Sequence, residues 1–482
     1  MFLKITNLFF NRVALAGVVI AAGLLFFSTW NLGNSPATWF DEGINMGIAK
    51  SFLLSGVYNL PTGPGEYVPE KSQLITTNYP VLIPVVVSLA AFGNSITVAR
   101  LPMVLFLFAF VALAYSFVKK ENSQSAALWS IALIVTFSPF YGNGKAVLGE
   151  VPGLVFFLAG LLLLPSVFER KKLFLAGLFF GLAAATKPFF LIIGVALLLG
   201  ELINGFSGDK IKQSLIRLIY IGIGAFLPLL VWVTTIMPRV SLSGLKSTLS
   251  FYSNSYAAQS FLPLVLKNAA RFFSETTPLH LTLLIVFSLY AWYKSARGGE
   301  KASERKLVVW IFIAINILWY LKTPGWYRYF FTAHMLAFLW FPAALEKIFS
   351  KRVVTILLSL LLVIQLVYLV QRRNDPLYFS LESDRASAKV SNLVKGGDSI
   401  LFVNAPSLAF VNKGHTVYQF LQINPQLFFG NKKFSDESGK PYNWVVVNGD
   451  IATTALGSEA ETLKQQYSRV AEEGHFVFYE HL

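Results

Sequence analysis

Long apolar runs separated by short basic segments constrain the fold of this chain more than any other feature. A helix that crosses a membrane needs about 20 apolar residues. Eleven runs approach that length, at residues 13–30, 97–118, 124–141, 151–168, 173–186, 188–203, 217–237, 279–293, 307–321, 329–345 and 353–370. The 482 residues are 55% hydrophobic and 13% charged, which excludes an ordinary soluble domain. We predict a polytopic α-helical membrane protein with about 11 transmembrane helices.

The basic segments between these runs predict the orientation of the chain. Lysine and arginine gather on the cytoplasmic side of a membrane, and here they fall repeatedly on the side of the N-terminus. The segments are 119–120, 170–172, 210–217, 294–306 and 347–352. Lys4 and Arg12 precede the first run and no small-residue cleavage site follows it. We therefore expect a retained first span with a cytoplasmic N-terminus.

The apolar stretch at residues 79–92 is the exception to this alternation. It has about 14 residues and contains Pro80 and Pro84, so it is short for a crossing helix. Counting it as a span would place the basic segment 119–120 on the outer side, against the positive-inside rule. We expect an interfacial or re-entrant helix here.

The net charge of +15 is unevenly distributed. Residues 1–374 contain 31 Lys and Arg against 13 Asp and Glu, whereas residues 375–482 contain 9 against 12. We interpret the basic excess as membrane topology and contact with anionic lipids, and we expect no nucleic-acid partner. The absence of cysteine excludes disulfides and thiolate metal sites. No Walker or Rossmann glycine pattern is present, which disfavours nucleotide-driven transport.

The change in composition near residue 374 predicts two domains. We predict that residues 1–374 form a transmembrane domain with a first outer loop at 31–96, and that residues 375–482 form a small soluble α/β domain. Strands are expected at 398–403, 443–447 and 474–480, and a helix at 458–467. The span count places this second domain on the outer, or periplasmic, side of a plasma (inner) membrane.

Asp41 and Glu42 form an acidic pair just beyond the first apolar run. They follow Trp39-Phe40, and aromatic residues favour the headgroup level of a membrane. A carboxylate there is partly desolvated, which raises its pKa, while nearby cations lower it. That balance suits a general base. The alternative is that Asp41 caps a helix that begins near Gly43, and position alone leaves both interpretations open.

Glu150 and three cations reach the same predicted face of the membrane. Glu150 begins the fourth run, where an acid also favours the helix dipole. Arg100 opens the second run, Lys187 separates the fifth from the sixth, and Arg328 precedes the tenth. Snorkelling to lipid headgroups explains each cation alone. Together they would suit a phosphate whose lipid tail stays in the bilayer.

The two histidines that lie near outer ends of apolar runs have no metal-binding spacing. His280 and His334 are single residues without a second histidine three or four positions away. We interpret both as packed or hydrogen-bonded residues.

Five short motifs follow one another along the chain. They are Phe40-Asp41-Glu42-Gly43, Tyr79-Pro80, Ala99-Arg100-Leu101-Pro102, Gly149-Glu150-Val151-Pro152 and Thr186-Lys187-Pro188. In this order they resemble the GT-C superfamily of membrane glycosyltransferases, which use polyprenyl-phosphate sugars. The chain is most similar there to the dolichyl-phosphate-mannose protein mannosyltransferases and the bacterial lipid A aminoarabinose transferases. The resemblance covers residues 10–200 well and 329–341 weakly.

The resemblance implies a role for each matched residue. Asp41 would accept a proton from an acceptor hydroxyl as it attacks the anomeric carbon, so that the sugar inverts and polyprenyl phosphate leaves. Glu42 would hold the acceptor or the base, and Glu150 would be a second acidic residue. Arg100 and Lys187 match positions associated with the lipid phosphate.

Two positions depart from the family pattern. Tyr79 stands where the lipid A transferases carry a lysine directly before the proline, and Glu150 stands where aspartate is more common. The first difference weighs against that narrower assignment within the superfamily.

We therefore expect an inverting glycosyltransferase that moves a sugar from a polyprenyl-phosphate donor to a hydroxyl of a protein, lipid or glycan on the outer face. Its catalytic residues would be Asp41, Glu42 and Glu150, and Arg328 would join Arg100 and Lys187 in binding phosphate. We assign no protein metal site, although a divalent cation is a conceivable cofactor. The alternatives are a lipid-linked glycan translocase and a non-catalytic glycan-binding membrane subunit. Transporters place ionisable groups near the midplane on interrupted helices, a pattern that this sequence does not show clearly.

Overall fold

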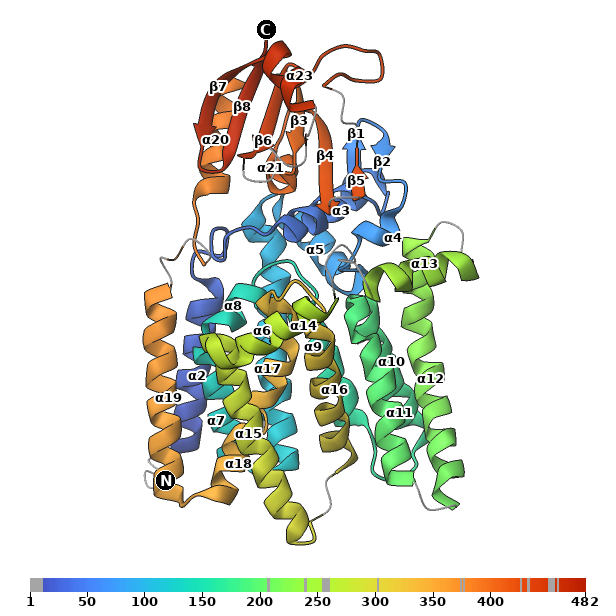
Figure 1. The fold of residues 1–482 in the computed structure, drawn as a ribbon, viewed down its shortest axis with the longest axis vertical. Coiled ribbons are helices and arrows are strands. Elements are labelled where there is room, and N and C mark those ends of the chain that lie inside the picture. The colour runs from blue at the N-terminus through green and yellow to red at the C-terminus, as the bar shows by residue number, and fades with distance from the viewer. Residues whose placement is uncertain are drawn as a thin grey trace, which may run out of the picture.

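The structure is a computed structural model in which a bundle of helices carries a β-sheet at one end (Figure 1). It describes residues 12–482 apart from the segments 206–208, 238–240, 254–260, 301–302, 373–374, 376–377, 425–426, 431–433, 450–455 and 457–458. The expectation of a mainly helical chain with a C-terminal α/β part is confirmed.

Each predicted apolar run corresponds to a helix or to a broken helix. The unbroken ones are α2 (Arg12–Thr29), α6 (Ile96–Glu121), α9 (Glu150–Leu163), α10 (Arg170–Thr186), α12 (Asp209–Ile236), α16 (Glu304–Tyr320) and α19 (Lys351–Arg372). The sixth run begins with the short turn η1 (Pro188–Leu191) and continues as α11 (Ile192–Gly205). By length and composition, α6, α12 and α19 are apolar enough to cross a membrane.

Several runs bend instead of continuing straight. α7 (Gln124–Thr136) meets α8 (Ser138–Gly144) at 68°. The predicted run 279–293 lies within α15 (Thr276–Arg297), which α14 (Phe261–Ser274) meets at 77° just before the run begins. By length and composition, each bent pair could form one further span. The tenth run divides into η2 (Tyr327–Tyr329), α17 (Phe331–Phe338) and α18 (Phe341–Ile348). Proline stands in the first turn of α8 and of α18, where its missing N–H costs least. The number of 11 spans stays a prediction.

Three of the predicted basic segments meet at the end of the bundle away from the sheet (Figure 1). Arg305 forms an ion pair with Glu121 at 2.9 Å, and Lys306 donates to Asn122 Oδ1 at 3.2 Å. Lys347 pairs with Glu300. Residues 121–122 and 303–306 therefore contact each other, as the alternation of the runs predicts.

The first loop folds over the opposite end of the bundle. It consists of α3 (Phe40–Ser55), the two-stranded sheet of β1 (Pro61–Gly63) and β2 (Glu66–Tyr67), α4 (Lys71–Leu74) and α5 (Tyr79–Phe92). Figure 1 shows α3 lying across the bundle, between the helices and the C-terminal sheet. α13 (Leu242–Ser253) and α14 cover the same end. α5 has the 14 residues predicted for it.

The C-terminal part is a six-stranded sheet with helices on both faces. Its order is β5-β4-β3-β6-β8-β7, in which β4, β3 and β6 are parallel and the outer strands antiparallel. The strands are β3 (Ser399–Val403), β4 (Thr416–Asn424), β5 (Leu427–Phe429), β6 (Trp444–Asn448), β7 (Tyr467–Glu473) and β8 (Phe476–His481). α20 (Glu382–Leu393) and α21 (Pro406–Val411) pack on one face and α23 (Glu459–Gln466) on the other. The three predicted strands and the predicted helix are thus present within two residues.

Close contacts join this sheet to α3. Lys50 donates to the carbonyl oxygens of Phe410 and Asn412 at 2.7 and 3.1 Å, which satisfies free carbonyl groups at the C-terminus of α21. Gly43 lies directly against α21, and a Cβ atom placed there would be 2.6 Å from the backbone nitrogen of Ser407. The sheet therefore rests on the helix that carries the acidic pair.

We predict that Gly43→Ala destabilises the protein by about 1–3 kcal/mol, because backbone must move to admit the methyl group. Thermal unfolding of the purified protein measures this. Gly47→Ala is the matched control on the same helix, since its Cβ atom would meet only the end of the Leu60 side chain. Equal melting temperatures for the two variants would contradict the tight contact between α3 and α21.

Candidate active site

Asp41 is the second residue of α3, not its cap. The helix begins at Phe40 with Trp39 at the capping position, and the Trp39 N–H donates to Glu42 Oε2 at 3.4 Å. The interpretation of Asp41 as the cap of a helix starting near Gly43 is therefore wrong, because the helix starts three residues earlier and Glu42 accepts the free backbone N–H. The Asp41 carboxylate is therefore not used to cap α3 and can pair with side chains from other elements.

Glu42 forms a fully buried, two-pronged ion pair with Arg100. Arg100 Nε lies 2.7 Å from Glu42 Oε1 and Nη2 lies 2.6 Å from Oε2, and both side chains have no exposed area. Glu42 Oε1 also accepts the Val147 N–H at 2.9 Å. Arg100 Nη1 donates to the carbonyl oxygens of Leu32 and Pro36 at 2.8 and 3.0 Å. One pair thus joins α3, α6, the start of the first loop and the segment before α9.

Asp41 forms an ion pair with Arg328. Arg328 belongs to η2 and lies 287 positions later in the sequence. The Asp41 side chain is 31% exposed and that of Arg328 9%. The Arg328 guanidinium lies over the rings of Trp39, Trp326 and Tyr329, with 5.5–5.9 Å to the ring centres. Aromatic faces attract a cation in this geometry, so they hold the guanidinium at the Asp41 carboxylate.

Glu150 and Lys187 form a second ion pair beside the first. Glu150 is the first residue of α9 and Lys187 follows the last residue of α10, and their side chains are 3% and 13% exposed. The Lys187 charge acts on Asp41, and the Glu150 charge acts on Arg328. Asp41, Glu150, Lys187 and Arg328 therefore form one group, which we call the charged quartet.

Two atoms of the charged quartet are buried without a partner among the described residues. They are Glu150 Oε2 and Arg328 Nε. Buried polar atoms in folded proteins nearly always have a partner, since desolvation without one costs about 1–3 kcal/mol. An unsatisfied donor on a cation and an unsatisfied acceptor on a carboxylate fit a ligand that carries both an anion and a hydroxyl group.

The quartet sets the protonation state of Asp41. Burial alone raises the pKa of this carboxyl, but the charge and hydrogen bond of Arg328, aided by Lys187, outweigh it and hold the pKa below its ordinary value. Asp41 is therefore a carboxylate at neutral pH, able to accept a hydrogen bond or a proton.

The structure separates the six predicted site residues into two groups. Asp41, Glu150, Lys187 and Arg328 come together, as the shared predicted face requires. Glu42 and Arg100 lie behind them, and neither side chain has exposed area. Arg100 has its donors directed to Glu42 and to backbone carbonyls, so its position does not support the expected contact with a lipid phosphate. The pair instead fixes the start of α3 and thereby the place of Asp41.

Two polar residues beside Lys187 were missed in the sequence. The Asn78 N–H donates to the carbonyl of Thr186 at 3.1 Å. Thr77 and Asn78 are fully buried, and Thr77 Oγ1 and both side-chain atoms of Asn78 lack a partner in the described part of the chain. The only available signal was a Thr-Asn pair directly before the Tyr79-Pro80 motif.

A second missed group supports the turn that carries Arg328. Asn268 Nδ2 donates to the Thr323 carbonyl at 2.7 Å, and Arg271 Nη1 donates to that of Gly325. Both come from α14 and fix the segment that leads into η2. These contacts join residues more than 50 positions apart, so no local pattern in the sequence indicated them.

The interpretation of His280 and His334 as packed or hydrogen-bonded residues is confirmed, and the two side chains contact each other. His280 Nδ1 lies 3.0 Å from His334 Nε2, and the Tyr327 hydroxyl lies 3.3 Å from His334 Nδ1. Tyr327 directly precedes Arg328, so the pair packs behind the turn η2. The separation of 54 positions along the chain hid this contact in the sequence.

Metal binding has no support from clustered ligands in the described residues, where no three His, Asp or Glu side chains gather as a metal site requires. Each acid of the quartet faces a cation instead. A divalent cation therefore stays an expectation from the sequence alone.

Known proteins share this fold. The structure superposes on ArnT from Cupriavidus metallidurans in the apo state with a TM-score of 0.62 at 12% sequence identity, covering 96% of this chain and 97% of that one. ArnT bound to undecaprenyl phosphate gives 0.60 at 12% identity with the same coverage. The oligosaccharyltransferase of Archaeoglobus fulgidus gives 0.60 at 13% identity, covering 97% of this chain and 73% of that one. A search of curated protein sequences finds no match.

These likenesses show that the chain has the GT-C fold, and the resemblance noted in the motifs is confirmed. More narrowly, residues 80–232 match the family described as Dolichyl-phosphate-mannose-protein mannosyltransferase. This segment includes Arg100, Glu150 and Lys187 and ends before Arg328.

We predict that Arg100→Ala lowers stability by about 3–5 kcal/mol, because it leaves the Glu42 carboxylate buried without a cation. Thermal unfolding in detergent measures this loss. Arg328→Gln is the comparison, since it removes a cation whose partner Asp41 is partly exposed and is expected to cost far less. An Arg100 variant as stable as the Arg328 variant would contradict the structural role of the Glu42–Arg100 pair.

Proposed function

We propose that this protein is an inverting glycosyltransferase that moves a sugar from a polyprenyl-phosphate donor to an acceptor hydroxyl at the outer face of the membrane. The observation that carries the proposal is the charged quartet, in which a carboxylate base lies against two cations. Support also comes from the GT-C fold and from the related fold of ArnT bound to undecaprenyl phosphate.

The quartet divides naturally into a base and an anion site. Arg328 and Lys187 supply positive charge for the donor phosphate, and Arg328 Nε is an unsatisfied donor for one of its oxygens. Asp41 is the general base. Glu150 holds Lys187 through their ion pair, and Asn78, beside Thr186, offers an amide for a sugar hydroxyl or the phosphate.

The reaction is a single displacement. The acceptor oxygen attacks the anomeric carbon while Asp41 takes the hydroxyl proton. The bond between that carbon and the phosphate oxygen breaks, and its electron pair leaves with polyprenyl phosphate. Arg328 and Lys187 stabilise the charge that grows on the leaving phosphate. Because attack and departure occur on opposite sides, the configuration of the sugar inverts.

The binding partners and the placement in the membrane belong to the same proposal. The outer face is the one with the quartet and the C-terminal sheet, since the contacts among the basic segments lie at the other end. The acceptor is a protein, lipid or glycan hydroxyl. A translocase fits less well, because the four charges meet at the end of the bundle covered by the first loop and not between helices at mid-depth.

The proposal predicts that Asp41→Asn lowers transfer by about 10²–10⁴-fold, the usual contribution of a general base. Purified protein in lipid nanodiscs would be given a panel of undecaprenyl-phosphate sugars with host membrane extract as acceptor. Release of undecaprenyl phosphate, measured by mass spectrometry, reports turnover. Asp384→Asn, an exposed acid on α20, is the matched control. Full activity of the Asp41 variant with a donor used by the wild type would refute the catalytic assignment.

The pKa of Asp41 predicts the pH dependence of the same reaction. Only the carboxylate form accepts a proton, so activity falls as pH drops through the pKa of Asp41. Since Arg328 holds that pKa below its ordinary value, wild-type kcat/KM should persist below the pH at which an ordinary Asp protonates. In Arg328→Gln the pKa rises and the acid limb moves to higher pH, besides the weaker donor binding. An unmoved acid limb would show that Arg328 does not tune the base.

A further inference from the structure

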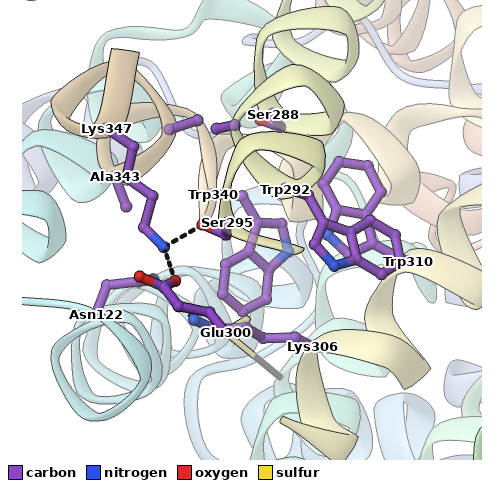
Figure 2. A pocket seen from close by; sticks show the side chains of 12 residues that line it. Asn122, Ser288, Trp292, Ser295, Glu300, Lys306, Trp310, Trp340, Ala343 and Lys347 are labelled. Carbon is purple, nitrogen blue, oxygen red and sulfur yellow. Dashed lines mark hydrogen bonds and ion pairs between the residues drawn. The ribbon is translucent and has the colours of Figure 1, made fainter. Parts of the chain in front are cut away.

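A pocket lies at the end of the bundle opposite the charged quartet. It opens between α15, α16 and α18 and has a cavity volume of about 80 Å³, within about 570 Å³ of empty space that includes open solvent. Tryptophan and lysine side chains dominate its wall (Figure 2). The basic segments that the positive-inside rule assigns to the cytoplasmic side surround it, so it is distinct from the proposed transfer site.

Three indoles form the apolar part of this pocket. Trp292 of α15 and Trp310 of α16 stack with ring centres 6.3 Å apart and planes 16° from parallel. Trp340, just before α18, completes the lining, and the Lys306 ammonium lies 5.5 Å from its ring centre. Tryptophan favours the boundary between hydrocarbon and headgroups. The lining therefore combines apolar rings with a cation, as is typical of the boundary between hydrocarbon and headgroups.

Two lysines supply positive charge within the same pocket. Lys306 donates to the neutral Asn122 Oδ1 at 3.2 Å, and among the described ion pairs none includes Lys306. Lys347 is held by Ser295 Oγ at 2.6 Å and by Glu300, whose side chain is 63% exposed. Figure 2 shows Lys347 directed at Glu300 beside Asn122. The lining thus carries one cation more than it has acids.

Three buried donors in this lining lack a partner in the part of the chain that the structure describes, and the Asn122 Nδ2 amide is one of them. The Trp340 side chain Nε1 and the Ser288 hydroxyl are both unsatisfied, and these residues are only 5% and 4% exposed. An indole N–H can only donate, so an acceptor oxygen is the group that it needs. A cation and unsatisfied donors in one pocket point to an anion rich in oxygen.

We propose that this pocket binds the phosphate of an anionic phospholipid, whose acyl chains lie along Trp292 and Trp310. Lys306 is the main charge contact, Trp340 Nε1 donates to a phosphate or glycerol oxygen, and Lys347 adds charge at the rim. A zwitterionic lipid carries its own cation next to the phosphate, which Lys306 would repel. The proposal needs no particular sugar or acceptor and does not depend on the transferase activity.

The test is lipid binding to the full chain purified in neutral detergent. Dioleoyl-phosphatidylglycerol and dioleoyl-phosphatidylcholine would be titrated separately, with native mass spectrometry and thermal stabilisation as readouts. We expect phosphatidylglycerol to bind more tightly, and Lys306→Gln to weaken it about fivefold, the effect of losing one lysine near an anionic lipid. Trp340→Phe, which removes only the indole donor edge, should also weaken it.

Matched controls separate the pocket from general surface charge. Lys171→Gln removes an exposed lysine at the same end of the bundle and should leave binding unchanged, and Lys306→Arg should retain it. Equal losses in Lys306→Gln and Lys171→Gln, or equal binding of the two lipids by the wild type, would overturn the proposal. So would stabilisation by glycerol 3-phosphate alone equal to that by the lipid, because the occupant would then be a soluble phosphate.

Discussion

The buried pair of Glu42 and Arg100 is the interaction on which the rest of the site depends. It binds α3 to α6 and to the backbone at Leu32, Pro36 and Val147. Two charges without exposed area are tolerated only because each has several partners. Since Asp41 is the neighbour of Glu42 on the same helix, the pair that fixes α3 also fixes Asp41, the proposed base. One acid of the Asp-Glu motif is thus structural and the other faces the site.

Contacts between residues far apart in the sequence place the other charged side chains of the quartet next to Asp41. Arg328 arrives on a turn supported by Asn268, Arg271 and the two paired histidines. The C-terminal sheet packs on α3 through Gly43 and Lys50. A movement of the sheet would therefore be transmitted to Asp41, which connects this α/β part to the proposed reaction. The bundle end with the tryptophan pocket shares none of these contacts.

The helices were predictable from the sequence because apolar length is a local property, and so were the buried strands β3 and β6. The bends in these helices could not be predicted from the sequence, although proline stands at several of them, because tertiary packing decides whether an apolar run breaks. β7, exposed along much of its length, lacked an apolar signal. In the site, the gathering of Asp41, Glu150, Lys187 and Arg328 at one end of the bundle was predictable. The ion-pair partners could not be predicted, since Asp41 and Arg328 are 287 positions apart. Nothing in the local sequence distinguishes Arg100 from a residue that binds phosphate.

The central claim is that the quartet is a base beside a phosphate site, and a structure with undecaprenyl phosphate bound tests it most directly. Electron cryomicroscopy of the protein in nanodiscs loaded with this lipid would locate the phosphate. We expect its oxygens within hydrogen-bond distance of Arg328 and Lys187, with the Asp41 carboxylate facing the open side where an acceptor would approach. A phosphate bound elsewhere, with Arg328 still paired to Asp41 and Lys187 to Glu150, would contradict the account.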